Sequence, residues 1–202
     1  MDGTVTQLSK AIRERADDIS TPFSLANALY AKHDLDQAIV QYRETLRLKP
    51  DFAEAHFNLG IALRDEHDID AAIAEYRAAI RSKPVLAEAH NSLGAALRYK
   101  QDLDGAIAEF REALRLQPDF ADAHSNLGTA LRNKHDVNGA IAEYREALRL
   151  KPNLAAAHFN LANALNAKQD FSGAVAQYHE ALRSGPGASG QERLGWSNCR
   201  IS

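Results

Sequence analysis

The chain of 202 residues contains a single cysteine, Cys199, so no disulfide can form within it. A cysteine content this low is typical of a protein from a reducing compartment. Eleven glycines and six prolines are too few for a disordered or fibrous chain. The 24 basic residues are outnumbered by 27 acidic ones, which argues against nucleic acid as a partner, because a protein that coats nucleic acid is strongly basic.

Long apolar segments are also missing from the sequence. No run approaches the ~18 residues that a membrane helix needs, so we expect no membrane insertion. The first residues, Met-Asp-Gly-Thr, lack the basic and then apolar stretches of a secretory signal. We therefore expect a cytoplasmic protein, with enough apolar residues for one domain or two.

Five of the six prolines follow one another at intervals of 34 residues, and such a fixed period predicts a repeat protein. With proline at position 32, the predicted repeats 1 to 5 span residues 19–52, 53–86, 87–120, 121–154 and 155–186. In every repeat, leucine occupies positions 7 and 11, and Ala or Gly occupies position 8. Alanine occupies position 20, and an aromatic residue occupies position 24.

Each repeat is predicted to form two helices, because its apolar positions recur every three or four residues. The small residues at positions 8 and 20 would let the two helices approach closely. A break falls at positions 15 to 18, where the second polar residue is the expected N-cap of the second helix. These expected caps are Asp36, Asp70, Asp104, Asn138 and Ser172.

This pattern resembles the tetratricopeptide repeat, a helix–turn–helix of 34 residues with Leu-Gly, Ala, Tyr or Phe, and Pro at these positions. The resemblance covers residues 19–186 and implies an all-α fold, a right-handed superhelical solenoid of paired helices. The sequence departs from the family at position 4, which is often Trp. Here it is proline in repeat 1 and histidine in the others: Pro22, His56, His90, His124 and His158.

The two ends of the chain differ from the repeats between them. Residues 4–15 align with a second helix, so we expect an N-terminal half-repeat over residues 1–18. Residues 187–202 break the pattern and are expected to form an irregular tail. Because solenoids usually need a polar cap, three alternatives remain: the tail folds back, the chain is a fragment of a longer protein, or the exposed end packs on another copy.

The resemblance implies a concave surface lined by the first helices, with ligand contacts at positions 2, 5, 6, 9, 12 and 13. Position 12 carries Arg64, Arg98 and Arg132, roughly 10 Å apart for packed helices, and Arg presents a planar fork of donors to carboxylates. This row favours a partner with an acidic segment. Alternatively, each arginine complements its own helix dipole and the aspartate four residues on.

Asparagines and aromatic residues complete the candidate groove. An amide side chain can both donate to and accept from a peptide backbone, and in this family, as in the superhelix of O-linked N-acetylglucosamine transferase, such a row holds extended peptides. Exposed aromatic rings are good anchors for a partner. The alternative is structural, with the amides bonding backbone groups and the rings packing between repeats. These candidates are Asn58, Asn126 and Asn160 at position 6, Asn163 at position 9, Phe57 and Phe159 at position 5, and Tyr99 at position 13.

Other site classes find little support in the sequence. Chaperone-binding members of the family hold a carboxylate with Lys or Arg at positions 2, 5 and 6, and none occurs there. The histidines recur mainly at positions 4 and 15, too far apart to share a zinc ion, so we expect structural roles for them. We identify no catalytic constellation and expect neither enzymatic activity nor a cofactor.

The favoured hypothesis is a protein–protein interaction scaffold that binds a peptide segment of a partner in the groove. Two alternatives stay open. The chain could self-associate into a homo-oligomer through its uncapped C-terminal end, or it could be the substrate-recruiting fragment of a larger enzyme such as a glycosyltransferase.

Overall fold

The computed structural model describes residues 19–185, and the predicted half-repeat and tail lie outside this range. In the described part every regular element is an α-helix, which confirms the predicted fold class. The chain divides into two compact units, residues 1–116 and 117–202. The first unit contains α2 (Ser20–Ala31), α3 (Leu35–Leu48), α4 (Ala53–Asp65), α5 (Ile69–Ser82), α6 (Ala87–Tyr99) and α7 (Leu103–Leu116), and the second contains α8 (Ala121–Asn133), α9 (Val137–Leu150), α10 (Ala155–Ala167) and α11 (Phe171–Ser184).

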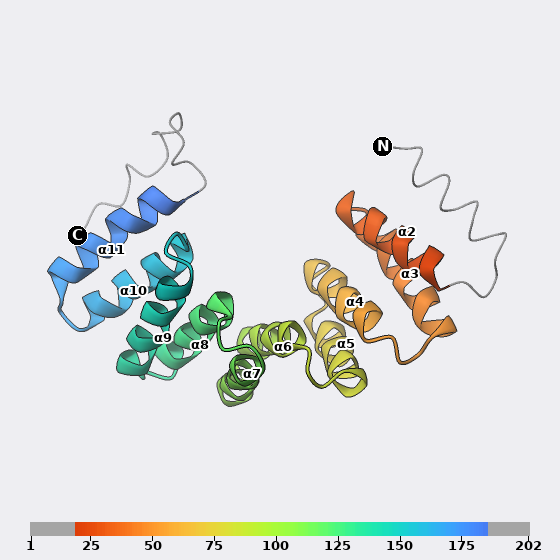
Figure 1. The fold of residues 1–202 in the computed structure, drawn as a ribbon, viewed down its shortest axis with the longest axis horizontal. Coiled ribbons are helices and arrows are strands. Elements are labelled where there is room, and N and C mark those ends of the chain that lie inside the picture. The colour runs from red at the N-terminus through yellow and green to blue at the C-terminus, as the bar shows by residue number, and fades with distance from the viewer. Residues whose placement is uncertain (1–18, 186–202) are drawn as a thin grey trace. The chain divides into compact units, whose positions relative to one another are not determined.

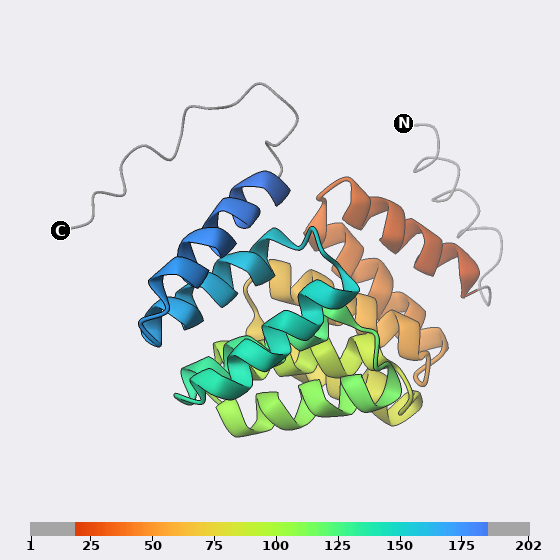
Figure 2. The same cartoon turned by 60° about the vertical axis from the view of Figure 1, so that its left-hand side comes forward.

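Two kinds of helix contact build each unit. The helices of one repeat pack against each other, as α10 and α11, both blue, do in Figures 1 and 2. The second helix of a repeat also packs on the first helix of the next, α3 on α4 and α5 on α6 in the first unit, and α9 on α10 in the second. Within residues 19–185, no helix is both long and apolar enough to cross a membrane.

Small residues bring the two helices of a repeat together, as the sequence predicts. The alanine at position 20 is at most 2% exposed in all five repeats. At position 8, a Cβ added to Gly60 would lie 2.6 Å from Cε1 of Tyr76, and one added to Gly128 would lie 2.8 Å from Cε1 of Tyr144. The aromatic ring at position 24 therefore packs directly on the backbone of the first helix.

A single residue in the left-handed conformation ends each first helix. It is position 15 in every repeat: His33, His67, Gln101, His135 and Gln169, with φ between 61° and 65°. In repeat 2 the amide of His67 donates to the carbonyl of Arg64 and that of Asp68 donates to the carbonyl of Leu63, both at 2.9 Å. This pair of bonds satisfies carbonyls that the helix end leaves without partners.

The predicted N-caps were wrong by two residues. The capping side chain is the first acidic residue of each break: Asp34, Asp68, Asp102, Asp136 and Asp170 each accept a hydrogen bond from the amide three residues on, at 2.9–3.3 Å. The predicted caps lie inside the first turn of the second helix instead. The reason is the tight turn, because one left-handed residue leaves only position 16 to cap the helix.

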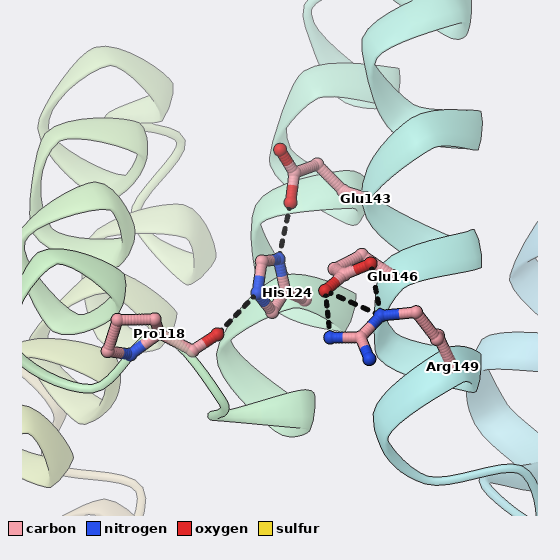
Figure 3. A network of polar contacts seen from close by, with 5 residues as sticks. All are labelled: Pro118, His124, Glu143, Glu146 and Arg149. Atoms are coloured by element: carbon pink, nitrogen blue, oxygen red, sulfur yellow. Dashed lines mark hydrogen bonds and ion pairs between the residues drawn. The ribbon is translucent and has the colours of Figure 1, made fainter.

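The histidine at position 4 ties three segments together (Figure 3). In repeat 4, Nδ1 of His124 lies 2.6 Å from Oε2 of Glu143 on α9, and Nε2 lies 3.1 Å from the carbonyl oxygen of Pro118 in the preceding loop. His56 and His90 make the same two contacts with their own glutamate and proline, and His158 makes them with Gln177 and Pro152. These contacts support the predicted structural role of the position 4 histidines.

Candidate peptide-binding surface

The asparagines of the first unit bond to other side chains. Oδ1 of Asn27 accepts hydrogen bonds from the hydroxyl of Tyr42 at 2.6 Å and from Nδ2 of Asn58 at 3.0 Å. Asn58 therefore links repeat 2 to repeat 1 through a side chain and not through the backbone group that the alternative interpretation expects. In the second unit, Oδ1 of Asn163 accepts from the hydroxyl of Tyr178 at 2.6 Å.

Arg64 is already occupied by a carboxylate. Its Nε and a terminal nitrogen donate to Oδ1 of Asp65 at 3.0 and 2.8 Å, and the hydroxyl of Tyr30 donates to Oδ2 of the same residue at 2.6 Å. Burial raises the pKa of Asp65, but these hydrogen bonds outweigh it and hold the pKa below the ordinary 3.8. The sequence interpretation paired Arg64 with Asp68 and missed Asp65, although the adjacent acid was the available signal.

Arg98 on α6 occupies the same repeat position as Arg64 but has a different environment. Its Nε is buried and has no hydrogen-bond partner within residues 19–185, and the guanidinium forms no ion pair there. Tyr99 follows it directly and is 69% exposed. The end of α6 therefore carries an arginine without a carboxylate partner in residues 19–185, followed directly by an exposed aromatic residue.

A buried hydroxyl in repeat 2 also lacks a partner. Tyr76 is fully buried, and its oxygen has no hydrogen-bond partner in the described part of the chain. Burial raises its pKa to about 12. The equivalent Tyr42 and Tyr178 each donate to an asparagine at position 9, whereas repeat 2 has Ile61 at that position. The sequence already shows this apolar residue opposite a tyrosine, but the sequence prediction did not compare positions 9 and 24.

The second unit carries the remaining predicted residues on α8 and α10, two helices that contact each other. Arg132 on α8 is half-buried, and its side chain, like that of Asn160 on α10, makes no hydrogen bond or ion pair within residues 117–185. Asn126 is also half-buried on α8. Phe159 is 48% exposed, and its ring centroid lies 5.8 Å from that of Tyr178 in the same repeat.

Phe57 is held by packing within its own repeat. Its ring centroid lies 6.0 Å from that of Tyr76, so the ring contributes to the packing of the two helices of repeat 2. Of the candidate residues, the first unit contains Phe57, Asn58, Arg64, Arg98 and Tyr99, and the second contains Asn126, Arg132, Phe159, Asn160 and Asn163. The row of three arginines involves both units and stays a prediction. Among residues 19–185, no three His, Cys, Asp or Glu side chains gather closely enough to hold a metal ion.

Solved structures with similar folds are numerous, while no curated protein sequence matches the chain. MamA is 26% identical, with a TM-score of 0.72 over 79% of this chain and 94% of that one. YrrB, described as a TPR protein with an unusual peptide-binding site, is 21% identical, with a TM-score of 0.71 over 89% of this chain and 92% of that one. PilF of Pseudomonas aeruginosa is 23% identical, with a TM-score of 0.76 over 85% of this chain and 79% of that one.

Family models agree with the repeat pattern and the paired helices. A model described as TPR repeat matches residues 26–65 and 96–134. Two models described as tetratricopeptide repeat match residues 125–189 and 53–85. The chain therefore belongs to the tetratricopeptide repeat family.

Proposed function

We propose that this protein is an interaction scaffold whose first helices bind a peptide segment of a partner, with an acidic side chain of that segment on Arg98 or Arg132. The observation that carries the proposal is the end of α6, where the half-buried Arg98 has no carboxylate partner within residues 19–185 and is followed by the exposed Tyr99. A planar guanidinium without a partner is the group best suited to a carboxylate, and exposed aromatic rings are frequent anchors of a bound peptide.

The arginine at position 12 of repeat 2 does not share this property. Because Asp65 neutralises Arg64 with two hydrogen bonds, Arg64 has less to offer an incoming carboxylate. Arg98 is therefore the candidate for the acidic residue in the first unit, and Arg132 is a separate candidate in the second. The description of YrrB as a peptide-binding protein supports the proposal only at the level of the shared fold.

The difference between Arg64 and the two arginines without a carboxylate partner provides the test. A library of peptides from acidic to basic is selected on the wild-type chain, and the affinity of an enriched peptide is measured for Arg98→Gln, Arg132→Gln and Arg64→Gln. We expect acidic peptides with dissociation constants near ~1 μM, weakened about tenfold or more by Arg98→Gln or Arg132→Gln, since a tenfold change is about 1.4 kcal/mol. Arg64→Gln serves as the matched control and should change the affinity about threefold at most, about 0.6 kcal/mol. A library without acidic enrichment, or equal losses in all three variants, would contradict the proposal.

A second function, self-association, is supported by the exposed face of α11. Val175 is 55% exposed, whereas the residues at the same position of repeats 1 to 4 are 7–8% exposed: Ile39, Ile73, Ile107 and Ile141. Phe171 and Leu182, on the same stripe, are 62% and 61% exposed. In α3, α5 and α9 this face packs on the first helix of the next repeat, so α11 continues an established interface without a partner in residues 117–185.

We infer that a second copy of the chain covers this face with its own α11. At the other end of the described part, Thr21 and Pro22 of α2 are already buried. Within residues 19–185, the stripe on α11 is thus a large exposed apolar face, and a two-fold axis places the same patch on both subunits of a symmetric dimer. Light scattering at rising concentration should report a dimer that Val175→Glu abolishes and that Ala176→Glu, exposed off the stripe, retains. A wild-type chain that stays monomeric at high concentration would refute the self-association.

A further inference from the structure

The second unit contains a cavity that the proposed function does not use. It has a volume of about 350 Å³ and lies between α9 and α10, beside the start of α11. Ile141 and Leu165 form its apolar wall, and both are 7% exposed. Asn138, Arg145, Lys168 and Asp170 supply its polar groups. These four polar residues are exposed, so the cavity opens to solvent, and its volume lies at the lower end of the range of small-ligand sites.

Within residues 117–185, neither cation of the cavity has a carboxylate partner. Nζ of Lys168 donates to Oδ1 of Asn138 at 2.6 Å, and this amide satisfies the ammonium but leaves its charge uncompensated. Arg145 has no hydrogen bond or ion pair within residues 117–185. The one carboxylate of the lining, Asp170, is engaged as the N-cap of α11, where it accepts from the amide of Gly173 at 2.9 Å and the hydroxyl of Ser172 at 3.2 Å. The cavity is therefore left with an excess of one positive charge.

The equivalent junction in the first unit, between α5 and the end of α6, differs from this cavity in its charge. There Nζ of Lys100 lies 3.0 Å from Oδ1 of Asp70, so the equivalent lysine is neutralised within the protein. Position 18 is aspartate in the first three repeats and asparagine only at Asn138, with serine in the last. The change from aspartate to asparagine in repeat 4 keeps the hydrogen bond to the lysine and removes the negative charge.

We propose that this cavity binds a carboxylate carried on a short aliphatic group, with the carboxylate between Arg145 and Lys168 and the aliphatic group on Ile141 and Leu165. The two cations suit a carboxylate, and an aliphatic group covers Ile141 and Leu165, which inorganic phosphate cannot do. Both the C-terminal residue of a peptide and a free branched-chain acid have this chemistry. The proposal is independent of the peptide surface on the first helices, because none of the cavity residues belongs to it.

The test uses the whole chain and four probes of defined chemistry. Calorimetry or NMR titration compares a tripeptide ending in leucine with a free carboxylate, the same tripeptide as its C-terminal amide, 4-methylpentanoate, and inorganic phosphate. We expect the free-carboxylate tripeptide or 4-methylpentanoate to bind at least tenfold more tightly than the amide and phosphate. The tighter of these two probes identifies the source as peptide or small acid. Equal binding of acid and amide, tighter binding of phosphate, or no binding at millimolar concentration would overturn the proposal.

One variant tests the charge argument without risk to the fold. Asn138→Asp introduces the carboxylate that Asp70 supplies to Lys100, so the protein should fold as before while its affinity for the acid falls at least tenfold. Arg145→Gln should lower the affinity by a similar factor. Arg77→Gln, at the same position of repeat 2, is the matched control and should leave binding unchanged. An Asn138→Asp protein that binds the acid as tightly as the wild type would show that the uncompensated lysine is not the ligand.

Discussion

The imidazole of His124 lies 2.6 Å from the carboxylate of Glu143, nineteen residues later on the partner helix of the same repeat. The other ring nitrogen contacts the carbonyl of Pro118, so one side chain joins the two helices of repeat 4 to the loop before them. A few residues along α9, Arg149 and Glu146 pair on the helix surface (Figure 3). Because the histidine is shielded and the Arg149 pair is exposed, we expect the first contact to contribute more to stability.

Replacing His124 with alanine should lower the free energy of unfolding by about 2–3 kcal/mol. The change leaves a partly buried carboxylate and a carbonyl without their donor, and hydrogen bonds to charged groups contribute about 1.5–3 kcal/mol. Urea unfolding followed by circular dichroism measures the difference. His179→Ala on α11 is the control, since His179 is exposed and has no partner within residues 19–185, and it should cost less than ~0.5 kcal/mol. Similar losses in both variants would contradict the role assigned to His124.

Removing the hydroxyl of Tyr76 should be neutral or stabilise the protein by up to about 1 kcal/mol. That oxygen is buried without a partner, so its desolvation is not offset by a hydrogen bond. Tyr42→Phe removes a bonded hydroxyl and leaves Asn27 with one donor fewer, so it should cost about 1 kcal/mol. Thermal and urea unfolding of the two variants give the comparison, and a destabilised Tyr76→Phe protein would mean that the hydroxyl is bonded in solution.

The carboxylate of Asp65 should stabilise the protein at neutral pH and lose this effect in acid. Its pKa is lowered in the folded chain, so the unfolded chain binds the proton first as the pH falls. The stabilisation is complete above the ordinary pKa of 3.8 and is lost as the pH falls below it. Asp65→Asn should therefore be less stable by about 1–2 kcal/mol at pH 7, with the gap closing toward pH 3. Glu66→Gln, an exposed neighbour, controls for net charge and should show no such gap.

The two acidic residues at the start of α3 should differ in their effect on stability. Asp34 accepts a hydrogen bond from the amide of Gln37 at 3.3 Å, and loss of an N-cap typically costs about 1 kcal/mol. Asp36 lies in the first turn and interacts with the helix dipole, an effect typically worth about 0.3–1 kcal/mol at an exposed site. Unfolding of Asp34→Ala and Asp36→Ala measures both values, and a larger loss for Asp36 would restore the N-cap that the sequence pattern suggested.

The helix pairs and their packing were predictable because they depend on strict periodicity. A glycine or alanine at position 8 opposite an aromatic ring at position 24 specifies a close approach wherever the pattern recurs, and the structure confirms it. The N-cap was misplaced because the sequence does not show that a single left-handed residue, such as Gln101, completes the turn. The pattern locates a break, but backbone dihedral angles decide which residue follows it.

The candidate site was harder to predict because it depends on which neighbours a long side chain selects. Arg64 and Arg98 occupy the same position of the repeat, yet one finds a carboxylate next to it and the other does not. A prediction from the repeat position alone assigns both arginines the same role. The missing acceptor of Tyr76 follows from Ile61 at position 9, whereas repeat 3 avoids the problem with Phe110 opposite Ala95. Such departures become visible only when positions are compared in pairs across a repeat.

The histidine bridge also bears on how the chain could evolve in length. Each bridge connects a repeat only to itself and to the loop that precedes it, so duplication of one 34-residue segment supplies both halves of every new bridge. The free energy of such an array is approximately a sum over single repeats and adjacent pairs. A duplicated repeat would therefore be stabilised by contacts that the sequence already encodes.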